Sequence, residues 1–315
     1  MTVVTVSTAS APVPAATRAP APAARPRRTG ANGLLAVPAL VFFVVFALVP
    51  LAGAVVLSFA DWDGLGELGW AGWSNWAGVL TDPVTGQALL LTVKIMVVSW
   101  LVQTPISLLL GVFTAGTQRY RAVLAVLYFV PLLLSSAAVA IAFKAILDPN
   151  FGIGGAPGLG FLAQDWLGDP DLVLYVVIFV IAWQFVPFHT LLYQAGVRQI
   201  PTSLYEAATI DGASTLQQFR HITLPQLRYT IVTSSTLMLT GSLTYFDVVF
   251  VLTGGGPGTS TRLLPLDMYL TGFSANDMGG ASVLAVILVV AGLGLAFVLT
   301  RFSGFARMSS EQEGL

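Results

Sequence analysis

Six long blocks of apolar residues run through this chain, and their length constrains the fold more than any other feature. Each block holds about 20 or more residues, enough for an α-helix to cross ~30 Å of hydrocarbon. The blocks lie at Leu34–Phe59 and at 88–113, 122–147, 171–197, 226–252 and 281–302. Because lipid offers no partners to backbone polar groups, we expect each block to be a helix. The sequence therefore predicts an all-α membrane protein with six transmembrane helices.

Composition agrees with this interpretation and excludes several kinds of site. Only 9% of the residues are charged and 56% are hydrophobic, whereas an average soluble domain has roughly 25% charged residues. Cysteine is absent, so disulfides, thiolate metal sites and cysteine nucleophiles are excluded. His189 and His221 are the only histidines, and neither has a carboxylate partner at metal-ligand spacing. We therefore expect packed or surface histidines and no metal site.

The positions of the basic residues predict the orientation in the membrane, because Lys and Arg gather in cytoplasmic loops. One side receives all of Arg18, Arg25, Arg27, Arg28, Arg119, Arg121, Arg198, Arg220, Arg228, Arg301 and Arg307. The opposite side receives only Arg262. Both termini should therefore be cytoplasmic. Lys94 and Lys144 lie near the outer ends of their blocks, where their charged ends can reach the interface.

The predicted cytoplasmic loop 198–228 looks unlike an idle connector. Ser203 followed by Glu206 has the spacing of a capping box and predicts a helix that begins at Ser203. Gly212 is placed to end that helix. Ser214 and Gln217 repeat the capping spacing and predict a second short helix that leads toward the next span. On this evidence alone, Glu206 serves either local capping or binding to a partner.

Residues 206–225, EAATIDGASTLQQFRHITLP, resemble the Glu-Ala-Ala signature of permeases in binding-protein-dependent ABC importers. The signature positions are matched by Glu206, Ala207, Ala208, Gly212, Ile222, Leu224 and Pro225. The resemblance implies that this short helix sits in a cleft of a separate ATPase and transmits its ATP-driven closure to the spanning helices. The coupling residues that it implies are Ser203, Glu206, Ala207, Ala208, Asp211 and Gly212.

Further segments are similar to the carbohydrate branch of these permeases, the maltose- and glycerol-phosphate-type first subunit. They are Phe246-Asp247 followed by LTGGGP at 252–257, Ile200-Pro201 with Tyr205, and Met278-Gly279-Gly280-Ala281. The chain lacks the extra spans and large outer domain of some maltose-type members. The resemblance implies a type I ABC importer permease (MetI-like) bundle that imports a sugar or oligosaccharide through the cytoplasmic membrane of a bacterium.

The same resemblance implies the partners and the domain organisation. The partners are a second homologous permease, two ATPase subunits that bind ATP and Mg, and an extracellular sugar-binding lipoprotein. The permease itself would need no cofactor and catalyse no reaction. Residues 1–30, rich in Ala, Pro, Ser and Thr, are predicted to be a disordered cytoplasmic tail. Residues 31–305 would form the transmembrane permease domain and 306–315 a cytoplasmic C-terminal tail.

Polar and aromatic residues in two spans suggest a path for a hydroxyl-rich cargo, which needs hydrogen-bonding groups and aromatic faces. The candidates recur at helical spacing in the fourth and fifth blocks: Gln184, Phe185, Phe188, Met238, Ser242, Tyr245 and Asp247. Taken one by one, these side chains also fit plain packing, with Ser242 bonded to its own helix and Gln184 holding two helices together. Asp247 also fits an ion pair with Lys94 or Lys144.

Three other functions remain to be weighed. An ion-coupled secondary transporter needs buried relay residues, and only Asp247 qualifies. A membrane enzyme needs a catalytic cluster, and no such motif is visible. An ABC permease for glycerol phosphate or another polar solute should have a cationic residue in its path. The chain has no phosphate-binding P-loop motif, so ATP hydrolysis must come from another subunit. Its basic residues mark topology and indicate no nucleic-acid partner.

Overall fold

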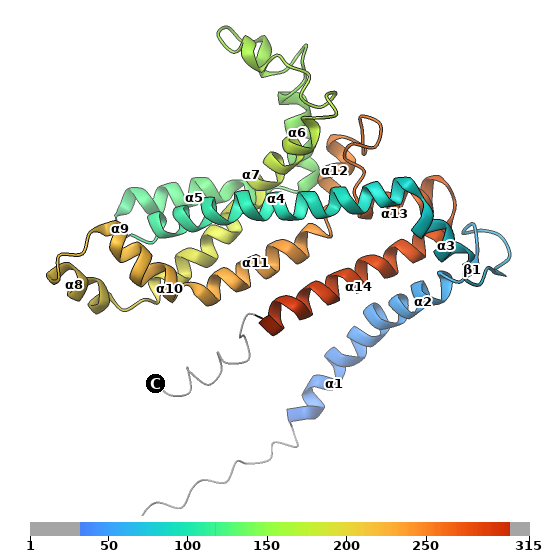
Figure 1. Cartoon of the computed structure of the whole chain (residues 1–315), viewed down its shortest axis with the longest axis horizontal. Helices are drawn as coiled ribbons and strands as arrows, with labels where there is room; N and C mark the ends of the chain where they lie inside the picture. The colour runs from blue at the N-terminus through green and yellow to red at the C-terminus, as the bar shows by residue number, and fades with distance from the viewer. Residues whose placement is uncertain (1–31, 117, 303–315) are drawn as a thin grey trace, which may run out of the picture. The chain divides into compact units, whose positions relative to one another are not determined.

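The computed structural model describes residues 32–116 and 118–302, and helices dominate these residues (Figure 1). The predicted tails 1–30 and 306–315 lie outside the described residues. The chain divides after Leu48 into two units that are described separately. The described part of the first unit contains α1 (Asn32–Phe43) and a π-helix, η1 (Val44–Leu48). Apolar side chains such as Phe42 and Phe46 are exposed there, as expected for a surface that faces lipid.

The second unit contains all other described elements. Its first half has α2 (Val49–Leu57), β1 (Ala60–Asp61), β2 (Gly69–Trp70), α3 (Ser74–Thr81), α4 (Pro83–Thr114), α5 (Arg119–Leu133), α6 (Ser136–Ile146) and two 3-10 turns, η2 (Ile153–Gly155) and η3 (Gly160–Leu162). Its second half has α7 (Val173–Arg198), α8 (Thr202–Ile210), α9 (Thr215–Gln218), η4 (Phe219–Thr223), α10 (Leu224–Gln226), α11 (Arg228–Ser242), α12 (Asp247–Leu252), α13 (Leu264–Tyr269), η5 (Leu270–Ser274) and α14 (Met278–Phe302).

Four of the predicted blocks are helices long and apolar enough to cross a membrane. They are Ala36–Leu57, Pro83–Thr114, Val173–Arg198 and Met278–Arg301. The block predicted at 122–147 is instead a pair of helices, α5 and α6, bent by 97°. It counts as a fifth span if the pair crosses the membrane as one element. The count of six spans and the cytoplasmic termini stay predictions.

The bend between α5 and α6 has a local cause. Pro131 lacks a backbone donor, which weakens the last turn of α5. Leu134 and Ser135 then adopt extended backbone, and the Ser135 side chain accepts a hydrogen bond from the Ala138 amide at the start of α6. The chain therefore turns sharply at the point where the sequence predicts a continuous span.

The block predicted at 226–252 is also broken, because α11 ends at Ser242 and α12 begins at Asp247. Hydroxyl groups just before and within the break bond back to the chain: Ser242 Oγ donates to the Leu239 carbonyl and Thr244 Oγ1 to the Gly241 carbonyl. Such bonds compete with the helical ladder. The prediction of one uninterrupted fifth span is therefore wrong, and the break creates the site described below.

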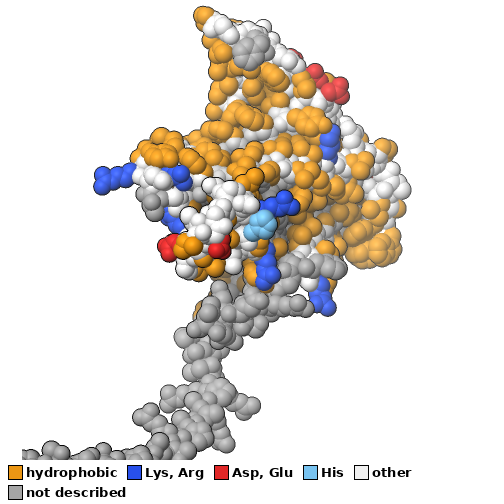
Figure 2. Space-filling model, turned by 60° about the vertical axis from the view of Figure 1, so that its left-hand side comes forward, with side chains coloured by type: hydrophobic (Ala, Val, Ile, Leu, Met, Phe, Trp, Pro, Cys, Tyr) orange, Lys and Arg blue, Asp and Glu red, His pale blue; other side chains and the backbone are white. Residues whose placement is uncertain are grey.

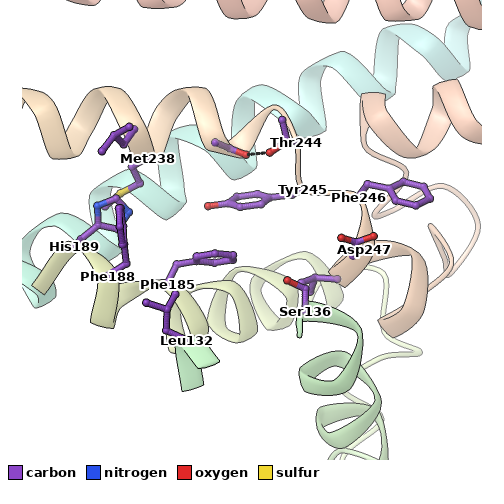
Figure 3. Close-up of a pocket in the computed structure, with 13 residues that line it drawn as sticks. Leu132, Ser136, Phe185, Phe188, His189, Met238, Thr244, Tyr245, Phe246 and Asp247 are labelled. Carbon is purple, nitrogen blue, oxygen red and sulfur yellow. Dashed lines mark hydrogen bonds between the residues drawn. The ribbon is translucent and has the colours of Figure 1, made fainter. Parts of the chain in front are cut away.

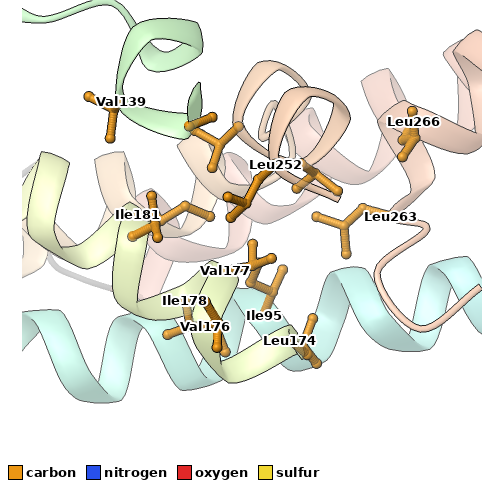
Figure 4. Packing of buried hydrophobic residues seen from close by; sticks show 14 residues of the cluster. Ile95, Val139, Leu174, Val176, Val177, Ile178, Ile181, Leu252, Leu263 and Leu266 are labelled. Carbon is orange, nitrogen blue, oxygen red and sulfur yellow. The ribbon is translucent and has the colours of Figure 1, made fainter. Parts of the chain in front are cut away.

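The core of the second unit lies between α4 and α7, the two helices most extensively packed together. The buried face of α4 is made mostly of small or polar residues: Ala88, Thr92, Ile95, Ser99, Gln103, Ser107, Gly111 and Thr114. A Cβ atom at Gly111 would stand 2.5 Å from the Tyr193 Cβ, so only glycine permits this approach of the two helices. Ile95, Val177 and Leu252 join α4, α7 and α12 in one apolar cluster (Figure 4).

The LTGGGP segment forms a compact turn that is tied to α4. Gly254 and Gly255 have φ angles of +63° and +92°, which disfavour any side chain. Beyond the turn, Arg262 forms an ion pair with the buried carboxylate of Asp267. Asp267 also accepts a hydrogen bond of 3.1 Å from Thr85 of α4. This end of the unit is therefore firmly held against α4.

Candidate functional site

The helix that carries the Glu-Ala-Ala signature is α8, and it begins differently from the prediction. Its N-cap is Pro201, with extended backbone angles of −58° and 130°, and no side chain caps the helix. Proline sets this φ angle by its ring, so α8 starts one residue before Ser203. The predicted cap at Ser203 is therefore wrong, and Glu206 does not close a capping box. Both side chains are exposed, which leaves the Glu206 carboxylate available to a partner.

The end of α8 and the start of α9 confirm the sequence prediction. Gly212 has a φ of +76°, and the Ala213 and Gly212 amides donate to the carbonyls of Ala208 and Thr209. This is the Schellman pattern of a glycine-terminated helix. Ser214 and Gln217 then form the predicted capping box, with N···O distances of 2.7 Å and 3.4 Å. The turn between the two helices is thus fixed by local chemistry.

Two apolar side chains beside this turn were missed by sequence reasoning. Ile210 is 87% exposed and Leu216 is 74% exposed. The acidic side chains of Glu206 and Asp211 are exposed nearby. Exposed apolar side chains next to acidic groups form a mixed surface typical of an interface. The signal in the sequence was weak, because an isolated Ile or Leu near a helix end more often packs inward.

We call residues 202–223 the coupling segment, and its two helices are braced to each other. The Tyr205 hydroxyl lies 2.9 Å from Thr223 Oγ1, and Gln218 Nε2 donates to Thr209 Oγ1 at 3.1 Å. From α9 the chain passes through η4 and α10 into α11 with little interruption. Figure 2 views the molecule with the left-hand side of Figure 1 turned forward, and basic side chains surround this region.

A cavity of about 430 Å³ opens where α11 is broken (Figure 3). Its wall combines the end of α5, the start of α6, the middle of α7 and the break itself. The lining residues are Leu132, Ser136, Phe185, Phe188, His189, Leu237, Met238, Gly241, Thr244, Tyr245, Phe246, Asp247 and Val248. The volume falls within the range of pockets that hold small organic ligands. The wall is mostly apolar, with a few polar groups that can orient a ligand.

Five of the seven residues predicted for a cargo path line this cavity: Phe185, Phe188, Met238, Tyr245 and Asp247. The Phe185 and Tyr245 rings are stacked, with centroids 6.0 Å apart and planes inclined by 30°. In Figure 3 the Tyr245 hydroxyl points along the cavity toward Met238 and His189. The arrangement presents an aromatic face beside polar groups.

The other two predicted residues, Gln184 and Ser242, do not line the cavity. Gln184 is 3% exposed, and its Nε2 donates to the Leu134 carbonyl and to Ser136 Oγ at the bend between α5 and α6. The Ser242 hydroxyl is occupied by its own helix. Helical spacing placed Gln184 on α7 and Ser242 on α11, and both helices contribute to the cavity wall. Gln184 instead contacts the bend between α5 and α6, and Ser242 contacts its own helix before the break.

Asp247 is exposed at the first position of α12. Within residues 32–116 and 118–302, neither Lys94 nor Lys144 forms an ion pair with it. The Lys94 ammonium instead lies 5.1 Å from the centre of the Tyr175 ring. The ion pair considered for Asp247 is therefore not formed, and its carboxylate is a free acceptor at the cavity. No Lys or Arg is found among the lining residues.

Metal binding finds no support in the described part of the chain, where no three His, Cys, Asp or Glu residues gather closely enough to hold an ion. His221 is exposed, and its Nδ1 lies 3.0 Å from the Gln217 carbonyl. His189 is buried as expected, yet its ring also contributes to the cavity wall. Nothing in the sequence distinguished these two histidines beyond their positions.

Residues 107–304 match the family described as binding-protein-dependent transport system inner membrane component. The chain belongs to this family. It is 34% identical over 276 residues to the probable ABC transporter permease protein YurN of Bacillus subtilis, covering 85% of this chain and 94% of that protein. It is also 34% identical to the multiple sugar-binding transport system permease protein MsmF of Streptococcus mutans, over 82% of this chain and 90% of that one.

The fold of the permease is shared with solved importers. A chain of a bacterial ABC transporter involved in the import of the acidic polysaccharide alginate superposes with a TM-score of 0.76, at 21% identity, covering 87% of this chain and 94% of that one. The resemblance seen at residues 206–225 is thus confirmed, as is the helical permease fold. The protein is a permease subunit of an ABC importer, in which separate subunits hydrolyse ATP.

Proposed function

We propose that this permease forms half of the membrane path of an importer for a neutral sugar or oligosaccharide in the cytoplasmic membrane of a bacterium. The observation that carries the proposal is the break in α11. One helix joins the coupling segment at its first end to a cavity with stacked aromatic rings at its second. A movement of the coupling segment therefore acts directly on the cavity wall.

The coupling segment is the proposed contact with the ATPase, which binds ATP and Mg. The proposed contact residues are Ser203, Glu206, Ala207, Ala208, Asp211 and Gly212. The small Ala207 and Ala208 side chains permit close approach, and the acidic groups can meet basic groups in a cleft. The exposed Ile210 adds apolar area to this contact. ATP-driven closure of the ATPase dimer would move α8, and α11 would carry that movement to the cavity.

The cavity chemistry supports a neutral, hydroxyl-rich cargo. The apolar faces of sugar rings stack on aromatic side chains, and Phe185 and Tyr245 supply such a surface. Asp247 can accept hydrogen bonds from sugar hydroxyl groups. The lining has a carboxylate and no cation, which disfavours glycerol phosphate and other anionic cargo. Relatives named for trehalose/maltose and for arabinooligosaccharides share 30% and 28% identity with this chain.

The proposed partners complete the importer. A second homologous permease would supply the other half of the path, and an extracellular sugar-binding lipoprotein would deliver the cargo. A related alginate transporter has been solved in complex with a pentasaccharide-bound periplasmic protein, at 20% identity to this chain. That chain shares the fold, and its assembly provides the pattern for this proposal. An ion-coupled secondary transporter would have no use for the coupling segment.

The proposal is tested by measuring uptake in vesicles that contain the whole importer and its binding protein. Radiolabelled maltotriose, cellobiose, N,N′-diacetylchitobiose and glycerol 3-phosphate are supplied with ATP inside the vesicles. We expect uptake of at least one neutral sugar that requires ATP and persists when a protonophore collapses the ion gradient. Uptake of glycerol 3-phosphate alone, or uptake that stops with the protonophore, would contradict the proposed cargo or the proposed mechanism.

A further inference from the structure

His189 occupies an unusual position, because it is almost completely buried and still forms part of the cavity wall. Its exposed fraction is 4%. The ring projects from α7 toward α11, where Nδ1 lies 2.9 Å from the Ser234 hydroxyl oxygen. The edge of its ring also meets the Phe188 ring, with centroids 5.2 Å apart. These contacts hold the imidazole in one orientation at the end of the cavity toward which the Tyr245 hydroxyl points (Figure 3).

The direction of this hydrogen bond follows from the serine. Ser234 Oγ forms no second hydrogen bond of good geometry among the described residues. Its proton therefore has an acceptor only if the hydroxyl donates to His189 Nδ1.

This hydrogen bond fixes the tautomer of the histidine. When Nδ1 accepts a hydrogen bond from Ser234, a neutral imidazole carries its proton on Nε2. Nε2 forms no hydrogen bond with the described residues, and the ring lines the cavity. The cavity therefore has one N–H donor at this end, while the Asp247 carboxylate at the break is an acceptor. The two groups offer complementary partners to a molecule lying on the Phe185 and Tyr245 rings.

We propose that His189 is a specificity-determining residue of the permease, donating a hydrogen bond from Nε2 to an acceptor oxygen of the sugar, with Ser234 as its positioning residue. The inference rests on the proposed function and adds a chemical requirement to it. A sugar must present a hydroxyl, ring or carbonyl oxygen opposite His189 when it lies on the aromatic pair. A site built around a fixed donor rejects analogues that lack the acceptor, because the donor is then left unpaired.

The first test asks whether position 189 is reached from the cavity, and it exploits the absence of cysteine from the chain. The assembled importer in lipid nanodiscs carries His189→Cys, and a small polar methanethiosulfonate is the probe. Val180→Cys is the matched negative control, since Val180 lies on the same helix with 0% exposure in the apolar cluster. Phe151→Cys, at a 92% exposed position outside the coupling segment, is the positive control.

We expect His189→Cys to react much faster than Val180→Cys. Saturating maltotriose, cellobiose or N,N′-diacetylchitobiose should slow that reaction without affecting Phe151→Cys. Reaction no faster than that of Val180→Cys would overturn the proposal, because the position would then be sealed in the core. Reaction that none of the three sugars slows would show a hydrated cavity without sugar contact and would also overturn it. The accessibility result stands even if the proposed sugar cargo is wrong.

The second test separates donation from packing. His189→Gln keeps an N–H donor at nearly the same reach, whereas His189→Leu keeps volume without a donor. We expect His189→Leu to raise the KM for uptake of the transported sugar about tenfold, the loss of one well-placed hydrogen bond, while His189→Gln stays much closer to the wild type. Ser234→Ala should raise KM by a smaller factor at unchanged Vmax. Equal KM values for the Gln and Leu variants would overturn the proposed donor.

Discussion

The coupling segment and the cavity differ in how far apart in sequence their defining residues lie. The coupling segment is contiguous in sequence, and a glycine at positive φ and a capping box within a few residues define its turn. The cavity draws its wall from α5, α6, α7 and α11, and its key groups, Ser136, Phe185 and Tyr245, are far apart in sequence. Local chemistry therefore encodes the first region, while packing between helices creates the second. Mutations should affect the two regions in correspondingly different ways.

The largest effect on uptake is expected at Gly212, where a substitution changes only the backbone conformation. Its φ is +76°, and no atom lies within 4 Å of an added Cβ. Gly212→Val should cost about 1–2 kcal/mol of local strain and misplace α8. We expect ATP-driven uptake to fall more than tenfold while basal ATPase activity persists. Gly78→Val is the control, because that helical glycine also has open space around it and an ordinary φ. Equal losses of uptake in the Gly212 and Gly78 variants would show that the turn has no special role.

A somewhat smaller effect is expected in the cavity. Tyr245→Ala removes one ring of the stacked pair and should lower uptake of the transported sugar about tenfold, chiefly through KM, with assembly unchanged. Tyr175→Ala provides the comparison, since Tyr175 is on α7 but outside the cavity. Uptake and KM are measured in the same vesicles for both. Wild-type KM in the Tyr245 variant would show that the aromatic pair does not touch the cargo.

Ile210 tests the apolar part of the coupling contact. Ile210→Asp should weaken binding of the ATPase subunits severalfold, because an exposed apolar side chain loses area that the partner would cover. Titration of detergent-solubilised permease pair with purified ATPase measures the change. Phe151→Asp is the matched control, as Phe151 is 92% exposed in a different loop. If Phe151→Asp weakens binding as much as Ile210→Asp does, the contact is not specific to the coupling segment.

The smallest effect on uptake is expected from the two serines of the coupling segment, Ser203 and Ser214. Ser214 caps α9 and Ser203 caps nothing. Ser214→Ala should therefore lower the stability of the turn by about 1 kcal/mol and reduce uptake modestly. Ser203→Ala should leave the stability of the turn unchanged, because its hydroxyl caps no helix. Hydrogen exchange of the α9 amides and uptake are the measurements. Faster exchange in the Ser203 variant than in the Ser214 variant would reverse the capping assignment.

The sequence predicted much of the fold and part of the site. Four long apolar blocks became helices, although α4 and α7 contain Pro105 and Pro187, because length and hydropathy suffice there. Ser203 was mistaken for a cap, since capping spacing ignores the fixed φ of Pro201 just before it. The block at 226–252 was taken as one helix, because hydropathy does not register the backbone bonds of Ser242 and Thr244. Periodicity places Gln184 on α7 and Ser242 on α11, and their part in a cargo path stays a prediction.

By itself, the sequence determined that the chain is a helical membrane protein with a coupling turn at Gly212, since these depend on apolar length and on interactions within a few residues. Only the tertiary structure decided that the bend between α5 and α6, the break after α11 and the His189–Ser234 pair come together at one cavity. That outcome depends on contacts between residues distant in the chain, whose energies no local pattern records.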